Sequence, residues 1–402
     1  MLLAEAVCVW RRERRVEVRA ASYLVSALAN NLPDIDIVYT WITTPKPLGS
    51  LLHHRGHTHT LVIGLAMAWL LGFTAWRVLR RRRPEWGAPE RRLVYGLALT
   101  GPLLHLALDF GNNYGVHPFW PLSSRWFYGD SIFIVEPTWW ALGVPLLATR
   151  LERRWLKVLL WLLLSTILAA CWFVPFVLTP SRVGLVALAL VSTVLAMRAS
   201  PRLSCSVVVA GCLLVPAGFA TASRYAKATV REATLQAFPA LAVHDVVTSP
   251  LPANPLCWEA LVAGEQGGVY RVIRSSVTLP PLSPARCLAG LDVVPTAGVK
   301  ASTRAPRLGV RFIHEYSLPV AELRRWYESS CVFRAGTQFF RLPFVSQRNE
   351  GDGVPPGWYA GDLRYDRAPD LDFSDMRLPH DAGACPRFLP GWGEPRAELL
   401  SP

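Results

Sequence analysis

The stretch "WLKVLLWLLLSTILAACWFVPFVL", residues 155–178, is the clearest apolar run in the chain. Its length is about that of an α-helix that crosses the hydrocarbon core of a bilayer. The composition agrees, because 51% of the residues are hydrophobic and only 18% are charged, against about 25% charged residues in a typical soluble domain. The 16 tryptophans are also typical of chains that contact membrane interfaces. The sequence therefore predicts a membrane protein.

Other segments of the first half share this apolar character and predict further membrane-embedded helices. They are residues 20–32, 61–76, 93–110, 138–148, 183–197 and 203–222. The last two form either two spans or one re-entrant pair. We expect residues 1–222 to be an all-α polytopic membrane domain with about five to six membrane helices.

The arginines indicate how these helices are oriented. They cluster in residues 11–19, 77–92 and 150–157, and more thinly at Arg198 and Arg202. Cytoplasmic loops are rich in Lys and Arg, so these clusters predict a cytoplasmic N-terminus and a periplasmic segment after about residue 223. The net charge of +13 is then a consequence of membrane topology. The expected partner is the lipid bilayer, and no nucleic-acid partner is expected.

From residue 223 the long apolar runs stop, and residues 223–402 are expected to form a small α+β, mostly β, extramembrane domain. Alternating residues predict half-buried strands and two helices. The strands are expected at 269–279, 307–316 and 337–347, and the helices at 224–237 and 318–330. Cys257, Cys287, Cys331 and Cys385 lie in this part. Disulfides and free thiols are both compatible with the pattern.

Polar islands interrupt the apolar first half, and ionisable groups in membrane segments mark functional sites by default because they are costly there. The islands are "NNLPDIDIVY" (30–39), "HHRGHTH" (53–59) and "HLALDFGNNYG" (105–115). His105 and Asp109 are four residues apart and share a helix face, as two ligands of one metal ion do. His59 is expected at the start of a helix capped by Thr58.

The predicted helix order brings the islands to one membrane face, which predicts a metal site there. The candidate ligands are Asp34, Asp36, His54, His59, His105 and Asp109. Histidine nitrogen with aspartate oxygen suits a divalent transition metal such as Zn²⁺, and the set is large enough for one or two ions. Arg55 is the candidate for neutralising a phosphate oxygen. Asp130 or Glu136 is the candidate general base.

Structural explanations remain open for parts of this set. Asp34 and Asp36 could stop and cap a helix, and His105 with Asp109 could be a buried hydrogen-bonded pair.

Five pieces of sequence, in this order, resemble the LexA-binding, inner-membrane-associated hydrolase family, also described as membrane-bound metal-dependent hydrolases. They are "LPDID" (32–36), "HRGHTH" (54–59), "HLALDFGNNYG" (105–115), "HPFWPLSSRW" (117–126) and "EP" (136–137). The resemblance covers about residues 4–150. The segments "SPLPANPLCWEAL" (249–261) and "GDLRYDR" (361–367) are similar to a C-terminal extension found in a bacterial subset of the family.

The resemblance implies a polytopic bacterial inner-membrane protein with metal-dependent hydrolase activity. Carried over by position, it implies the site residues Asp34, Asp36, His54, Arg55, His59, His105, Asp109, Asn112 and Glu136. The chain departs from the family pattern twice. It lacks an Asp-x-x-Thr-His segment before Leu2, so we expect either an upstream start or one missing ligand. It also has Glu136 where an Asp is more usual.

The function expected from the sequence is that of an integral inner-membrane hydrolase, in which metal-activated water attacks an ester or phosphoester at the periplasmic face. The alternative is a non-catalytic binding or regulatory membrane protein with a structural or sensory metal site. A proton-relay transporter is disfavoured, because the ionisable groups gather at one face. The substrate, a small molecule or a lipid, and the oligomeric state stay undetermined at this level.

Overall fold

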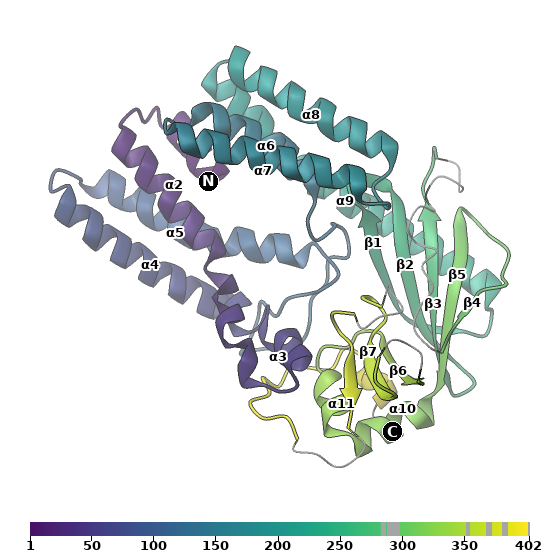
Figure 1. Ribbon diagram of the computed structural model, residues 1–402. Coiled ribbons are helices and arrows are strands. Elements are labelled where there is room, and N and C mark those ends of the chain that lie inside the picture. Colours follow the sequence, from purple (N-terminus) through teal and green to yellow (C-terminus); the bar gives the residue numbers. More distant parts are fainter. Residues whose placement is uncertain (283–286, 288–297, 351–353, 367–371, 380–384, 401–402) are drawn as a thin grey trace.

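The computed structural model describes residues 1–400 except 283–286, 288–297, 351–353, 367–371 and 380–384. A helical part comes first in the chain and a part built on antiparallel sheets follows it (Figure 1). The predicted fold class, a helical membrane domain followed by a mostly β extramembrane domain, is confirmed.

Within the described residues, the helical part contains eight α-helices that are longer than eight residues. They are α1 (Leu2–Trp10), α2 (Val16–Asn31), α4 (Leu61–Arg82), α5 (Ala88–Phe110), α6 (Pro137–Arg150), α7 (Arg154–Phe173), α8 (Thr179–Arg198) and α9 (Pro201–Ala237). Three short elements join α2 to α4: the 3₁₀ helix η1 (Pro33–Ile42), α3 (Lys46–His53) and the 3₁₀ turn η2 (His57–His59). Of the helices described, α4, α5, α7, α8 and α9 are long and apolar enough to cross a membrane.

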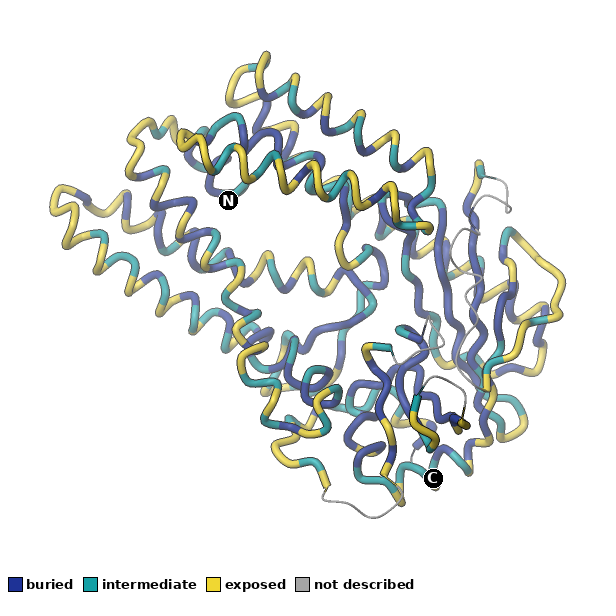
Figure 2. The backbone as a smooth tube through the Cα atoms, in the orientation of Figure 1, coloured by how far each residue is buried: buried dark blue, intermediate teal, exposed yellow. Residues whose placement is uncertain are grey.

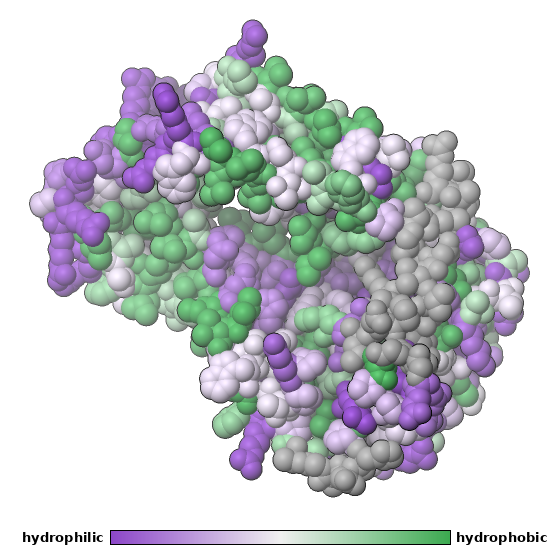
Figure 3. All heavy atoms as spheres, in the orientation of Figure 1, coloured by the Kyte–Doolittle hydropathy of each residue, from purple (hydrophilic) through white to green (hydrophobic). Residues whose placement is uncertain are grey.

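Exposed residues run along the outward faces of α4, α7 and α8 (Figure 2), and many of these are apolar (Figure 3). Leu70, Leu162 and Leu190 are examples. A soluble protein rarely exposes apolar patches of this extent, whereas a bilayer solvates them. A bilayer around these helices would therefore solvate the exposed leucines.

Polar contacts tie the arginine-rich ends of the helices together. Arg15, just before α2, pairs with Glu90 of α5 at 2.7 Å, and Arg150 of α6 donates to Ser204 of α9 at 3.1 Å. The helices alternate in direction, so α2, α5, α7 and α9 begin at this end while α4, α6 and α8 finish there. The opposite, arginine-poor end carries the polar islands.

The helices form two groups. One contains α2, α4 and α5, the other contains α6 to α9, and α1 packs against members of both. Figure 3 shows the surface hollowed between the two groups, with apolar side chains on both sides of the hollow.

The β part has two antiparallel sheets. The larger has the order β1-β2-β3-β5-β4 and the smaller has the order β6-β7-β8. The strands are β1 (Ala242–Leu251), β2 (Asn254–Gln266), β3 (Val269–Thr278), β4 (Val299–Ala301), β5 (Val310–Pro319), β6 (Pro343–Arg348), β7 (Gly357–Asp362) and β8 (Met376–Leu378). The helices α10 (Val320–Ser329), α11 (Cys331–Gly336) and α12 (Ala397–Leu400) complete it.

Helix α9 runs through the predicted domain boundary at residues 222 and 223 without a break. Its second half packs Ala226, Val230 and Ala233 against Trp258 and Ile273 of the larger sheet. The sequence pattern changes at 222 because the helix leaves an apolar environment there and begins to cover a sheet. The helix expected at 224–237 is therefore the end of α9.

The other face of the larger sheet shares a core with the loops of the helical part. Leu48 and Leu52 of α3, together with Tyr114 and Trp126, pack in one cluster with Phe339 and its neighbours. Both faces of β3 are consequently covered, so the expectation of a half-buried strand was wrong for β3, although β5 does alternate. Strands β1 and β2 were not predicted, because Pro250 and Pro255 interrupt the strand pattern near their connecting turn.

The four cysteines of the β part form two disulfides, Cys257–Cys287 and Cys331–Cys385. This decides between the alternatives that the sequence left open. The cysteines Cys8, Cys171, Cys205 and Cys212 are free thiols in the helical part.

Candidate metal centre

Four ligand atoms from three separate elements converge at the arginine-poor end of α4 and α5. His59 Nε2 lies 3.1 Å from His105 Nε2, 3.4 Å from Asp34 Oδ1 and 3.3 Å from Asp109 Oδ2. His105 Nε2 in turn lies 3.4 Å from Asp34 Oδ1 and 3.2 Å from Asp109 Oδ2. Asp34 comes from η1, His59 ends η2, and the other two share one face of α5. We call these residues the four-ligand group.

The outer nitrogen of each imidazole is committed to another partner. His105 Nδ1 lies 2.7 Å from the carbonyl oxygen of Asn30, which can only accept a hydrogen bond, so Nδ1 carries the proton. His59 Nδ1 lies 3.0 Å from Asp36 Oδ2. An ionised carboxylate also only accepts, so this Nδ1 atom carries a proton as well. In the neutral rings both Nε2 atoms then present lone pairs to the centre of the group. Metal-binding histidines in proteins are oriented by outer partners of this kind.

Five of the six distances among these atoms are 3.1–3.4 Å, which suits a divalent ion. Zn²⁺ binds nitrogen and oxygen at about 2.0–2.1 Å, and a tetrahedron of that size has edges of about 3.3–3.4 Å. Asp109 Oδ2 is buried and has no hydrogen-bond partner in the described structure. With both rings neutral, a cation at this point would bind the two carboxylates and the two imidazole lone pairs and offset the buried negative charge.

Asp36 is an orienting residue of the four-ligand group. It is fully buried, and its Oδ2 atom accepts from Thr58 Oγ1 at 2.9 Å as well as from His59. Burial alone would raise the pKa of Asp36, but hydrogen bonds from His54 and His59 outweigh burial and hold this pKa at about 2. Thr58 is therefore not the helix cap we expected. The helix α4 begins three residues later, at Leu61, and Thr60 Oγ1 caps it by accepting from the Ile63 N–H.

A second group of possible ligands adjoins the first. Ligand atoms of Asp34, Asp36 and His54 lie within 4.8 Å of one another, and His54 Nδ1 is 3.1 Å from Asp36 Oδ1. The side chains of Asp34 and His54 are 37% and 28% exposed, whereas His59 is fully buried. We call this the three-ligand group. It shares Asp34 with the first group, and together the two contain all six ligands predicted from the sequence.

Arg55 holds one of the ligands in place. Its Nη2 atom is 2.9 Å from Asp109 Oδ1, and its Nη1 atom donates to Asn112 Oδ1 at 2.8 Å. The guanidinium lies over the Tyr114 ring, and the residue is buried. The contacts of Arg55 thus orient Asp109. They do not support the predicted role of Arg55 in neutralising a phosphate oxygen. Asn112, a site residue that the resemblance implied, accepts a hydrogen bond from Arg55 and so helps to position it.

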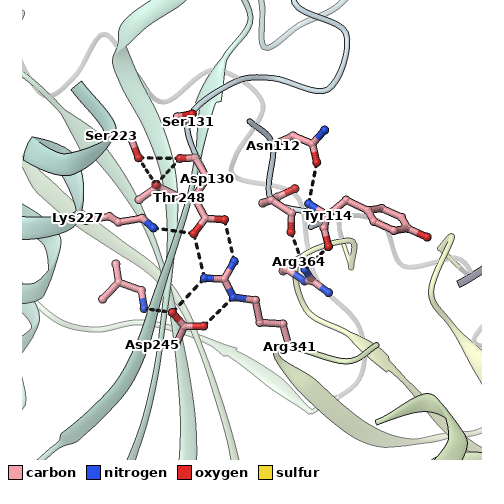
Figure 4. Close-up of polar contacts among 12 residues, drawn as sticks. Asn112, Tyr114, Asp130, Ser131, Ser223, Lys227, Asp245, Thr248, Arg341 and Arg364 are labelled. Atoms are coloured by element: carbon pink, nitrogen blue, oxygen red, sulfur yellow. Dashed lines mark hydrogen bonds and ion pairs between the residues drawn. The ribbon is translucent and has the colours of Figure 1, made fainter. Parts of the chain in front are cut away.

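Asp130 lies in a buried ionic network between the helical and β parts (Figure 4). Its oxygens accept from Arg341 at 2.7 and 2.9 Å and from Lys227 of α9 at 2.7 Å. Arg341 also pairs with Asp245 of β1 at 2.7 Å. Both carboxylate oxygens of Asp130 are therefore occupied by cations, and these contacts do not support its predicted role as a general base.

Glu136 caps α6. Its Oε1 atom accepts from the Thr138 N–H at 3.1 Å, and its Oε2 atom accepts from the Ala253 N–H in the turn between β1 and β2 at 3.2 Å. The residue is buried. These contacts join α6 to the larger sheet, so the predicted role of Glu136 as a general base is not supported either.

The β part holds the loops that carry the site. Arg364 donates to the carbonyl oxygen of Asn113 at 2.6 Å, next to the turn in which Asn112 Oδ1 accepts from the Tyr114 N–H (Figure 4). Trp392 Nε1 donates to the carbonyl oxygen of Leu52 at 2.8 Å. The residue types alone gave no indication of these contacts. The segment "GDLRYDR", noted for its resemblance, was the one sequence feature that contained Arg364.

Replacing Asn112 with alanine is expected to weaken metal binding by about 10–100-fold, as the loss of an outer-shell partner typically does. Arg55 would lose its acceptor, and the Asp109 carboxylate would then be held less firmly. Competition of the purified protein with a chelator of known affinity measures this change. The matched control is Asn113→Ala, because only the backbone oxygen of Asn113 is used by Arg364. Equal affinity of the two variants would contradict the orienting role.

Residues 1–178 match a family model described as YdjM inner membrane protein. No curated protein and no solved structure matches the chain. The matched residues include both ligand groups and α1 to α7 but not the β part. Taken with the apolar helices, the match identifies a multi-pass inner-membrane protein. The inner-membrane part of the predicted resemblance is confirmed, and hydrolase activity and LexA binding remain predictions.

Proposed function

Taking a multi-pass inner-membrane protein as the premise, we propose that this chain is a metal-dependent hydrolase that cleaves an ester or phosphoester at the membrane boundary. The observation that supports this most is the convergence of four candidate ligand atoms, from Asp34, His59, His105 and Asp109, beside a more exposed three-ligand group. Metal sites whose four coordination positions are all filled by protein ligands are usually structural, whereas catalytic metal sites leave one coordination position open for water or substrate.

The two ligand groups suggest separate roles, one in holding metal and one in receiving the substrate. A divalent ion bound at such a site activates water and stabilises the charge that develops on the ester oxygens. His59, His105 and Asp109 are largely buried and hold their part of the site rigidly, with Arg55 and Asp36 as orienting partners. The substrate would approach over Asp34 and His54, whose side chains are the most exposed of the six.

The proposed location of the site is the periplasmic face. The arginine-rich ends of the helices are the ends expected in the cytoplasm. The two disulfides lie in the part of the chain beyond the opposite ends, and disulfides persist in the bacterial periplasm but are rare in the cytosol. Charge and cysteine pairing therefore support the same orientation.

This orientation predicts which cysteines a membrane-impermeant maleimide polymer can label. In intact spheroplasts we expect labelling of Cys331 and Cys385 only after reduction, whereas Cys257 and Cys287 are fully buried and should need denaturation as well. Cys8 lies at the arginine-rich end and should be labelled only after the cells are opened and the protein is denatured, because it is buried. Mass shifts on gels measure both. Labelling of Cys331 and Cys385 without reductant, or only in opened cells, would contradict the orientation.

The test of the proposed activity compares His54→Ala with the parent protein. We expect the parent to contain about two equivalents of a divalent transition metal by mass spectrometry and to hydrolyse at least one member of an ester and phosphoester panel. The His54→Ala variant should keep about one equivalent, because the four-ligand group is intact, and should lose hydrolysis by at least about 100-fold. Metal binding without hydrolysis of any panel member would reject the hydrolase.

The second candidate function is a binding or regulatory membrane protein with a structural metal site. It is favoured by one observation, that the four-ligand group gathers four candidate protein ligands, the number that a tetrahedral structural site takes. In that case metal removal should unfold the site loops, and His54→Ala should have no effect on metal content. The same measurements therefore separate the two functions.

A further inference from the structure

The segment that supplies two of the ligands exposes apolar side chains on its other side. In η1, Asp36 is fully buried and Asp34 lies in both ligand groups, while Ile35, Ile37, Val38 and Trp41 are exposed. Val38 is 71% and Trp41 is 73% exposed. Large exposed apolar residues gathered in one short segment are unfavourable in water and mark an interaction surface.

This surface continues the apolar faces of the neighbouring helices. On α2, Leu24 and Leu28 are exposed and lie at helical spacing before Ile35, so they form a stripe that leads to it. On α5, the exposed residues Leu104 and Leu108 each directly precede a ligand, His105 and Asp109. The ligand groups therefore border an apolar surface that faces lipid along the membrane span.

A second loop exposes apolar residues at the same level. The Leu61 N–H at the start of α4 donates to the carbonyl oxygen of Pro118 at 3.0 Å, which places the loop 117–123 beside that helix end. Phe119 and Leu122 of this loop are exposed, Leu122 at 93%. Aromatic and apolar side chains beside a helix end are typical of the membrane–water interface. The ligand groups thus lie at the level of the lipid headgroups.

We propose, on the basis of the hydrolase function above, that the substrate is a membrane lipid of the surrounding leaflet with an ester or phosphoester near its headgroup. The surface made by Ile35, Ile37, Val38, Trp41, Leu104 and Leu108, which we call the lipid-entry surface, contacts the bilayer. The acyl chains of the substrate stay in lipid against α2 and α5, and its ester group reaches Asp34 and His54 without leaving the membrane boundary.

The proposed reaction is a balanced hydrolysis. The oxygen of one water molecule forms a bond to the carbonyl carbon or the phosphorus, and the bond from that atom to the alcohol oxygen breaks. The alcohol leaves with one proton of the water, and the acid product releases the other. No oxidant, reductant or second substrate is required, so water and the lipid suffice.

The first test is independent of activity and measures whether η1 contacts lipid. The protein and its Trp41→Phe variant are reconstituted in nanodiscs with plain or acyl-brominated phospholipids, and tryptophan fluorescence is compared. We expect bromine quenching to fall in Trp41→Phe, because Trp41 would be in contact with the quencher. The matched control is Trp358→Phe in β7 of the extramembrane part. Equal quenching in the parent and Trp41→Phe would overturn the lipid-entry surface.

The second test uses Val38→Gln combined with Ile37→Gln. Both side chains are exposed, so we expect parental metal content and parental hydrolysis of water-soluble p-nitrophenyl phosphate and p-nitrophenyl butyrate. Hydrolysis of phosphatidylethanolamine and phosphatidylglycerol vesicles should fall at least tenfold. The control is Leu308→Gln, an exposed leucine of the β part, which should change neither activity.

The outcomes separate this inference from the hydrolase itself. Hydrolysis of the soluble esters but not of lipid by the parent protein would overturn the lipid substrate and leave the hydrolase standing. Equal loss of both activities in the glutamine variant with normal metal content would also overturn it. A parent protein that binds metal and hydrolyses neither class would reject the hydrolase and the lipid substrate together.

Discussion

Replacing His105 with alanine is expected to strip the protein of the metal in the four-ligand group. His105 supplies one of the four converging atoms, and its Nε2 atom lies within 3.4 Å of each of the other three. The loss should exceed the factor of about 10–100 that outer-shell changes cause. Mass spectrometry of the detergent-purified protein measures it, with Asp109→Asn as a second ligand variant that preserves side-chain volume.

The control for this experiment is His57→Gln. His57 lies two residues from a ligand but packs against the rings of Trp120 and Trp392, and the two ligand groups among the described residues do not include it. Its metal content should equal that of the parent. Full metal content in both His105→Ala and Asp109→Asn would refute the four-ligand group. Gel filtration of each variant separates lost metal from lost folding.

Replacing Arg341 with methionine should cause the largest loss of stability. Arg341 is buried and compensates Asp130, which is fully buried, and Asp245 of β1. Removing one partner of a buried ion pair costs about 3–5 kcal/mol, because a charge is left in an apolar environment. Lys227 alone would remain at Asp130. Thermal unfolding in detergent and resistance to proteolysis measure the effect.

The control is Arg325→Met. Arg325 pairs with Glu322 on the surface of α10, and its side chain is 70% exposed, so the change should cost less than about 1 kcal/mol. Asp130→Asn provides a further check on the predicted general base. A stable Asp130→Asn protein that binds metal but lacks hydrolysis would restore the catalytic role of Asp130. We expect the Asp130→Asn protein to be less stable than the parent, because Arg341 would lose the charge of this partner.

The convergence of the six candidate ligands was predictable, because local patterns and helix order together suffice to bring them to one place. His105 and Asp109 share a helix face at a spacing of four residues, and the turn with His59 directly precedes α4. Antiparallel helices then bring these segments to one end. The assignment of ligands and orienting residues was not predictable, because it depends on which oxygen of Asp36 or Asp109 faces which nitrogen.

Arg55, Asp130 and Glu136 show the limit of reasoning from residue type. Each is a charged residue next to a motif, and a catalytic role was therefore predicted for each of them. Their partners lie 54, 211 and 117 residues away in the sequence, at Asp109, Arg341 and Ala253. No local pattern specifies such pairs. The structure shows that these charges connect the helical part to the loops and the β part.

The amino-acid sequence by itself determined that the chain is a membrane protein, where its apolar helices lie, that their arginine-rich ends gather at one end, and which side chains are the candidate ligands. Each of these follows from short-range properties, namely hydrophobicity, charge and helical period. Tertiary structure alone decided that α9 continues into the β part, that the larger sheet is covered on both faces, and that this core also holds α3 and the loop with Tyr114. Those features depend on contacts between distant segments, because burial of an apolar face is decided by the element that comes to cover it.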